Sequence, residues 1–348
     1  MLNKKKIKFG KSFKDVDKIK SNFFSQNLKL LRDQNKINNL YRSQPKRRYC
    51  KACEKKLKGE FFINHKTKFI QCKNCSHING THEDTNKFAN KIYIDEKVSY
   101  SKSYYEKNVK DFKLRQKKIY DPKVNFLKNN FKDHTKIKVL DIGAGSGYFV
   151  ASLLDKKFKD AIGLEVSKNQ IEFGKKIFKH IRKNPNKIQN TTYEDLKKHI
   201  KNTDFNCISL IGVLEHLVDM SEIMQLIKKN KKIKYLYVLV PMFSLICTIE
   251  SIFSNVFNRH LGGGHTHLFT ERSLKDFMFR FGFREHASWW FGTDMHDLFR
   301  SFIIQTQEKK FKPLEKMTLE TKNLIDNLQL EFDKKKLCSE VHMLLKRK

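Results

Sequence analysis

Residues 139–149, with the sequence VLDIGAGSGYF, decide the fold of this chain. A short apolar run leads directly into Gly143, Gly145 and Gly147, and an apolar helical pattern follows, which predicts a buried strand, a tight turn and a helix. Glycine permits the sharp turn and lets a ligand approach main-chain N–H groups at the start of the helix. The spacing differs from the dinucleotide fingerprint G-x-G-x-x-G, because Gly147 comes one residue too early.

The segments that follow this turn alternate between helical and strand-like patterns. Helices are expected at 149–158, 169–181, 221–230 and 273–283, and strands at 161–167, 205–212 and 234–240, with a last strand near 302–305. Alternation of this length predicts an α/β fold with a Rossmann-like, doubly wound and mostly parallel sheet. We expect this domain to span 136–306, with a lid-like insert at 241–270.

Two acidic residues flank the turn at positions suited to a cofactor. Asp141 lies two residues before the first glycine and can orient the amino group of an amino-acid-like ligand. Glu165 ends the next strand, 22 residues after Gly143, where a carboxylate accepts hydrogen bonds from ribose hydroxyls.

The motifs DIGAGSG, GLEVS, LIGVLEHL and YVLVP together resemble the class I S-adenosylmethionine-dependent methyltransferases, over roughly residues 95–305. The resemblance implies that S-adenosyl-L-methionine is the methyl donor and that Glu165 binds its ribose. It places the adenine near Glu194, with Asp195 as an equal candidate. It assigns the methionine part of the cofactor to Asp141, Gly143, Gly145 and Gly147.

Four cysteines precede this domain in the pattern C-x2-C-x18-C-x2-C. They form two pairs, Cys50 with Cys53 and Cys72 with Cys75, and each pair can place two thiolates on one knuckle. Two knuckles complete a tetrahedral site, so we predict a small zinc-ribbon-like module over 49–80. Four protein ligands leave no open position, which makes this zinc structural. Cys207, Cys247 and Cys338 are expected to be packing residues.

The order of the parts resembles bacterial methyltransferases with an N-terminal zinc-binding domain. These include sugar C-methyltransferases that act on nucleotide-linked keto sugars, and related enzymes of surface-polysaccharide assembly. A helical connector is expected over 92–135, and its Tyr104 and Tyr105 match the family's connector and are candidates for substrate binding.

Candidate catalytic residues follow the fourth and fifth strands of the sheet, where ligands bind in such folds. His216, next to Glu215, follows the fourth strand, and the insert supplies His265 and His267. A histidine titrates near neutral pH and can act as a general base. His265 aligns with the base of the sugar C-methyltransferases, although three glycines, 262–264, stand where that family carries Tyr and Glu. The His-Thr-His sequence has no third ligand at a recognisable spacing, so no catalytic metal is expected from it.

Charge and composition bear on the acceptor. The formal net charge is +35, but only 12 of the 72 basic residues are arginine, the residue that reads phosphates and guanines in bidentate fashion. A lysine-rich composition explains most of this excess. The favoured acceptor is a small anionic molecule, such as a nucleotide sugar or a surface-glycan precursor, with Arg259 clamping its phosphates.

Two other functions compete with this one. An RNA methyltransferase would use the zinc module and the basic leader to bind RNA, although the Asn/Asp-Pro-Pro-aromatic motif for exocyclic amines is absent after the fourth strand. A non-enzymatic cofactor-binding or scaffold protein is the third possibility.

The two ends of the chain and its location complete the expectations. Residues 1–48 are expected to form a flexible basic leader without a secretory signal, and 307–348 a helical tail. The most apolar stretch, 235–249, is too short and too interrupted by Pro241 to span a membrane. Reduced thiols and these features favour a cytoplasmic protein.

Overall fold

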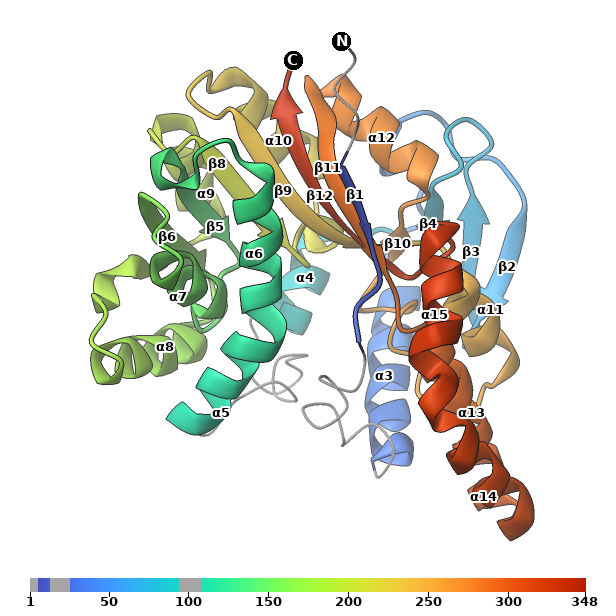
Figure 1. The fold of residues 1–348 in the computed structure, drawn as a ribbon. Helices are drawn as coiled ribbons and strands as arrows, with labels where there is room; N and C mark the ends of the chain where they lie inside the picture. The colour runs from blue at the N-terminus through green and yellow to red at the C-terminus, as the bar shows by residue number, and fades with distance from the viewer. Residues whose placement is uncertain (1–5, 13–25, 94–107) are drawn as a thin grey trace.

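An eight-stranded sheet forms the centre of the molecule in the computed structural model, which describes residues 6–12, 26–93 and 108–348 (Figure 1). The strands lie in the order β1-β11-β12-β9-β8-β5-β6-β7. Their bounds are β1 Lys6–Phe9, β5 Lys138–Ile142, β6 Asp160–Glu165, β7 Ile188–Asn190, β8 Cys207–Ile211, β9 Tyr235–Pro241, β11 Phe283–Phe291 and β12 Glu340–Arg347.

The direction of these strands confirms the predicted fold class. Strands β5 to β9 pair in parallel, and only β12 runs against its neighbours β9 and β11. The chain leaves β5 first toward β6 and later returns to β8 on the other side of β5. In open α/β sheets, ligands bind at the carboxyl ends of the strands at such a reversal. The glycine turn that follows β5 therefore lies at the position expected for a ligand.

Helices cover both faces of the sheet (Figure 1). One face packs on the buried cluster that includes Phe126, Phe149 and Phe178, and the other on the cluster that includes Ile223, Leu274 and Phe277. The helices of the first face are α5 Val109–Arg115, the π-helix η2 Gln116–Tyr120, α6 Asp121–Asn130, α7 Tyr148–Asp155 and α8 Lys168–His180, and those of the second are α9 Tyr193–Asn202, α10 Met220–Lys229 and α12 Glu271–Arg280.

A second sheet of four strands carries the cysteine pairs. It consists of β2 Phe61–Asn64, β3 Thr67–Gln71, β4 Ile78–Gly80 and β10 His267–Leu268, in the order β10-β4-β3-β2. The last of these strands comes from the insert after β9, with His267 opposite Asn79. The cysteine module is thus built from two segments that are almost 200 residues apart in the sequence, and its cysteines pack in the same apolar cluster as α10 and α12.

The N-terminal segment corrects one prediction. A flexible leader was expected over 1–48, but β1 pairs in parallel with β11 at the edge of the large sheet. Helix α3, Asn27–Arg42, also buries Ile37 and Tyr41 against Phe88 and Ile92. The prediction missed β1 and α3 because their apolar residues are few and widely spaced among lysines. Their packing partners, β11 and the helix that contains Phe88 and Ile92, lie far away in the sequence.

The C-terminal segment corrects a second prediction. A helical tail was expected over 307–348, but 340–347 forms β12, which inserts between β9 and β11. Burial on both faces gives this strand a nearly continuous apolar run instead of an alternating one, and that run also fits a helix. The strand expected near 302–305 lies instead within α13, Asp294–Glu308. The remaining helices are α4 Asn86–Tyr93, α11 Leu245–Ile252, α14 Lys312–Glu320 and α15 Ile325–Lys334.

Among the helices of the described residues, none has the length and apolar character needed to cross a membrane.

Candidate active site

The glycine turn connects β5 to α7 as predicted. All three glycines have positive φ, 71° at Gly143, 56° at Gly145 and 83° at Gly147, a region that disfavours residues with a Cβ. A Cβ on Gly143 would also lie 2.4 Å from Cγ2 of Val213. The loop after β8, which carries Val213, therefore lies directly against the turn.

Asp141 lies at the carboxyl end of β5 and is almost fully buried. Its Oδ1 accepts a hydrogen bond of 2.6 Å from the hydroxyl of Ser209 on β8. Burial raises the pKa of Asp141 to about 7, although the Ser209 hydrogen bond opposes the shift. A ligand ammonium group beside this carboxylate would restore its charge. Sequence analysis missed Ser209, because nothing in the sequence shows that it lies opposite Asp141.

Glu165 ends β6 and is held by the backbone around it. Its Oε2 accepts a hydrogen bond of 2.8 Å from the N–H of Gly145, and its Oε1 accepts bonds of 2.9 Å from the N–H groups of Val166 and Ser167. These bonds fix the carboxylate next to the glycine turn. Glu194 lies in the first turn of α9, where its side chain is 72% exposed and pairs with Lys197 at 2.8 Å. The roles of Glu165 and Glu194 toward a cofactor stay predictions.

A second group of polar side chains lies at the carboxyl end of β8. Glu215 and His216 belong to a short 3-10 helix, η5 Leu214–His216, and the insert brings His265 beside them. One oxygen or nitrogen from each of the three side chains lies within 4.8 Å of those of the other two. The imidazoles of His216 and His265 stack with centroids 5.0 Å apart. We call these three residues the Glu-His-His cluster.

Tyr93, at the end of α4, fixes the orientation of His216. Its hydroxyl donates to the carbonyl of Gly264 at 2.9 Å and lies 2.8 Å from Nδ1 of His216. When this hydroxyl donates to the carbonyl, Nδ1 of a neutral His216 ring donates to the tyrosine oxygen, and Nε2 of that ring is an acceptor. Sequence analysis missed Tyr93, which lies 123 residues from His216 in the chain.

His265 is oriented in the same way by the backbone. Its Nδ1 lies 2.8 Å from the carbonyl oxygen of His260, which can only accept, so Nδ1 donates and Nε2 is the acceptor. Burial lowers the pKa of His265 to about 4 and the pKa of His216 well below its usual value. Both rings are therefore neutral at physiological pH.

Glu215 is the buried acid of the cluster, with 3% of its surface exposed. Its Oε1 lies 4.0 Å from Nε2 of His216, and its Oε2 has no hydrogen-bond partner among the described residues. Burial raises the pKa of Glu215 to about 8. A buried carboxyl oxygen without a partner costs free energy, and a bound ion or ligand in contact with this atom would remove that cost.

Two other predicted site residues, His267 and Arg259, lie away from this cluster. His267 is fully buried on β10, where its Nδ1 lies 2.9 Å from Nε2 of His77 in the cysteine module. The guanidinium of Arg259 contacts both carboxylate oxygens of Asp297 at 3.0 Å, so an anionic ligand would compete with this carboxylate. Roles for His267 and Arg259 in the reaction stay predictions. Tyr104 and Tyr105 lie outside the described residues.

The four cysteines of the module come together as predicted. Their sulfur atoms lie within 4.8 Å of one another, with 3.6 Å between Cys50 and Cys75 and 3.8 Å between Cys53 and Cys72. Sulfur ligands about 2.3 Å from one tetrahedral ion are about 3.8 Å apart, so the cluster fits a structural zinc ion. Cys207, Cys247 and Cys338 are buried, as expected of packing residues.

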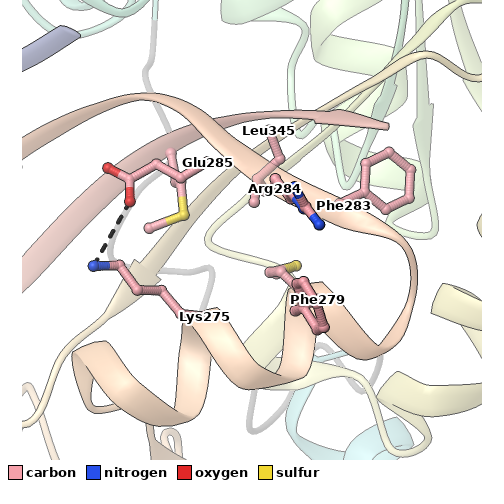
Figure 2. Close-up of a pocket in the computed structure, with 8 residues that line it drawn as sticks. Lys275, Phe279, Phe283, Arg284, Glu285 and Leu345 are labelled. Atoms are coloured by element: carbon pink, nitrogen blue, oxygen red, sulfur yellow. Dashed lines mark ion pairs between the residues drawn. The ribbon is translucent and has the colours of Figure 1, made fainter. Parts of the chain in front are cut away.

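A surface groove of about 360 Å³ lies between α12 and the strands β11 and β12 (Figure 2). Phe279, Phe283 and Leu345 line it, and Lys275 forms an ion pair with Glu285 at its edge. Leu345 pairs with Leu236 near the start of β9, which places the groove at the amino ends of the parallel strands. It therefore lies at the opposite edge of the sheet from the glycine turn.

Comparison with known proteins identifies the family. A family model described as a methyltransferase domain matches residues 112–287, just over half of the chain. The chain therefore belongs to this methyltransferase family, and with the glycine turn between β5 and α7 it is an S-adenosylmethionine-dependent methyltransferase. The non-enzymatic alternative is set aside. No curated protein matches the chain significantly.

Solved structures similar to this chain include three methyltransferases. One is a candidate sarcosine dimethylglycine methyltransferase from Galdieria sulphuraria, with 14% identity over 70% of this chain and 91% of that one, and a TM-score of 0.44. Geranyl diphosphate C-methyltransferase from Streptomyces coelicolor A3(2) has 11% identity over 70% and 85%, with a TM-score of 0.44. Magnesium protoporphyrin IX methyltransferase from Synechocystis PCC 6803 has 11% identity over 70% and 89%, with a TM-score of 0.45.

Proposed function

We propose that this enzyme transfers the methyl group of S-adenosylmethionine to a small anionic acceptor, such as a nucleotide-linked sugar or a surface-glycan precursor. The acceptor atom attacks the methyl carbon in line with the breaking carbon–sulfur bond. S-adenosylhomocysteine leaves with the electron pair of that bond, and a base takes the proton of the acceptor. The protein's part is to align the two reactants and to place the base.

The cofactor binds at the carboxyl ends of β5 and β6 in this proposal. Asp141 pairs with the ammonium group of the methionine part, and the glycine turn, 143–147, lets that part approach the main chain. Glu165 accepts hydrogen bonds from the ribose, and Glu194, after β7, contacts the adenine. The buried Asp141 carboxyl supports the first assignment, because burial disfavours its charged form and a ligand ammonium group beside it would stabilise that form.

One observation carries the position of the acceptor. Val213 touches the glycine turn, and the Glu-His-His cluster begins two residues later. The cluster therefore lies next to the turn at which the donor binds, at the edge of the sheet where such ligands bind. A group that removes the proton of the acceptor must lie next to the bound methyl donor, and the Glu-His-His cluster meets this requirement.

His265 is the base in this proposal. Its Nε2 is an acceptor, since Nδ1 donates to the carbonyl of His260, and the neutral ring can take a proton at physiological pH. The low pKa limits its strength as a base, so the site must also stabilise the anion that the acceptor becomes. His216 is the second candidate and is oriented by Tyr93, whereas His267 contacts His77 instead.

Methyl transfer to a panel of nucleotide-linked sugars and to RNA tests the acceptor. We expect transfer to the sugar nucleotides, and His265→Ala should lower turnover roughly 10²- to 10⁴-fold while leaving cofactor affinity nearly unchanged. His199→Ala, on the exposed side of α9, is the matched control. Transfer to RNA alone would reject the small anionic acceptor, and full activity of His265→Ala would reject the base.

RNA is the second candidate acceptor, and the net charge of +35 is the observation in its favour. A role in RNA binding predicts an affinity that falls steeply with salt, with a slope that reports several neutralised phosphates. The zinc ion in the four-cysteine site and a reducing, cytoplasmic location belong to the same proposal, because the cysteines bind the ion only as thiolates.

A further inference from the structure

We propose that Glu215, His216 and His265 hold a divalent transition-metal ion, which binds the acceptor. This inference rests on the proposed function only for the identity of the acceptor, and it replaces the role of His265 as base by that of a metal ligand. No catalytic metal was predicted from the sequence, because the histidines of the insert lack a third ligand nearby in the chain. The fold supplies the missing ligands from the loop after β8.

The first argument is the number and spacing of the donor atoms. One carboxylate oxygen and two imidazole nitrogens lie within 4.8 Å of one another, and Oε1 of Glu215 lies 4.0 Å from Nε2 of His216. Ligands about 2.0–2.2 Å from one ion lie about 3–4.4 Å apart, depending on the angle between them. The separations in the cluster, at most 4.8 Å, exceed this range only slightly, so small shifts of the side chains would let the three groups share an ion.

The second argument is the orientation of the two imidazoles. His265 donates through Nδ1 to the carbonyl of His260, and Nδ1 of His216 lies 2.8 Å from the hydroxyl of Tyr93, which itself donates to the carbonyl of Gly264. Metal-binding histidines almost always donate their other ring N–H to a carbonyl or a similar acceptor, because that bond fixes the tautomer and raises the basicity of the ligand nitrogen. His265 thus has the tautomer that a metal ion requires, and the contact of His216 with Tyr93 is of the kind that a metal-binding histidine makes.

The third argument is the state of Glu215. Its carboxyl group is buried, and Oε2 has no hydrogen-bond partner within the part of the chain that the structure describes. Oε1 lies 4.0 Å from Nε2 of His216, but that ring is neutral, so this contact does not balance the charge of a carboxylate. A divalent cation would satisfy the buried carboxylate and the two imidazoles together.

The ligand set defines the ion and the acceptor. Two imidazoles and one carboxylate suit zinc, iron, cobalt or manganese better than magnesium or calcium, which prefer oxygen ligands. Three protein ligands leave positions open, and an acceptor with two adjacent oxygens, such as vicinal hydroxyls, can fill them. The bound hydroxyl loses its proton to water more easily, its oxygen attacks the methyl carbon, and S-adenosylhomocysteine leaves. Nε2 of His265 is then a ligand and not the base.

Cobalt titration of the full-length protein with its four-cysteine site already loaded with zinc tests the proposal. We expect one further ion per chain, with the weak visible bands of a nitrogen–oxygen site and without the thiolate charge-transfer band of a four-cysteine site. Glu215→Gln, His216→Ala and His265→Ala should each weaken cobalt binding at least 100-fold. Tyr93→Phe, which removes the partner of His216, should weaken it about 10- to 100-fold. His199→Ala is the control that should bind as the wild type does.

The controls keep the outcomes distinct. Circular dichroism and S-adenosylmethionine affinity show that each variant is folded. Absence of a second ion in the wild type, or its retention in all three ligand variants, would overturn the metal site and would leave the proposed methyl transfer with His265 as base. Binding of the ion without transfer to any vicinal diol would support the site and reject that acceptor class.

Discussion

Replacement of Glu165 by alanine tests the cofactor assignment, and the structure sets the size of the effect. A carboxylate accepts about four hydrogen bonds, two at each oxygen. Oε1 already accepts the N–H groups of Val166 and Ser167, and Oε2 accepts that of Gly145. One position therefore remains on Oε2 for a ribose hydroxyl. Loss of one hydrogen bond to a charged group costs about 1.5–3 kcal/mol, so the affinity for S-adenosylmethionine should fall roughly 10- to 150-fold.

Calorimetric titration with S-adenosylmethionine measures this loss. Glu172→Ala, which removes an exposed acid from α8, is the control for a general change of charge and should bind as the wild type does. The alanine variant also frees three backbone N–H groups, so its thermal stability must be measured alongside to show that the protein is folded at the temperature of the titration. An unchanged affinity in a folded Glu165→Ala protein would refute the assignment of the ribose to this carboxylate.

Three further predictions rest on side-chain contacts among the described residues. The raised pKa of Asp141, about 7, means that the carboxyl is protonated below that pH, so affinity for the cationic cofactor should fall as the pH drops through 7. Asp141→Asn should bind the cofactor weakly and without this pH dependence. A wild-type affinity that is flat across this range would contradict the pairing of Asp141 with the cofactor ammonium group. Asp84 is buried between Arg47 and Lys51, and Asp84→Ala should lower the free energy of unfolding by about 3–5 kcal/mol. Asp33→Ala removes one side of an exposed pair with Lys36 and should lower it by under about 1 kcal/mol. Equal losses in chemical denaturation would argue against the buried network. The double variant Cys50→Ser, Cys72→Ser should lose one equivalent of zinc by elemental analysis while its affinity for S-adenosylmethionine changes little, and full retention of zinc would reject the four-cysteine site.

The parts of the site that sequence predicts are those set by local chemistry. Gly143 and Gly147 need positive φ values that few other residues adopt, and the two cysteine pairs place four thiolates by their spacing alone. Such requirements are visible as short motifs of a few residues in the sequence. The strand–turn–helix unit and the cysteine cluster were therefore predictable.

The parts that sequence missed depend on long-range contacts. Ser209 and Tyr93 act on residues 68 and 123 positions away, and no local pattern shows such pairings. Strand β12 was assigned to a helix because Leu337, Val341 and Leu344 are nearly in helical phase, while its two neighbouring strands decide the outcome. The third ligand of the Glu-His-His cluster was missed for the same reason, since His216 and His265 come together only after the sheet has formed.

The pairing of β10 with β4 has a consequence for how this protein can be recombined. The cysteine module ends in the sequence before the methyltransferase domain begins, so a gene fusion at residue 80 or 135 looks natural. Such a chimera would separate β4 from β10, the strand with which it pairs, and His265 lies two residues before β10. The cysteine module and the 241–270 insert are therefore expected to be inherited together. A homologue in which the cysteine module has been replaced is expected to carry a replaced insert as well, and a substrate preference would be transferred only with both segments.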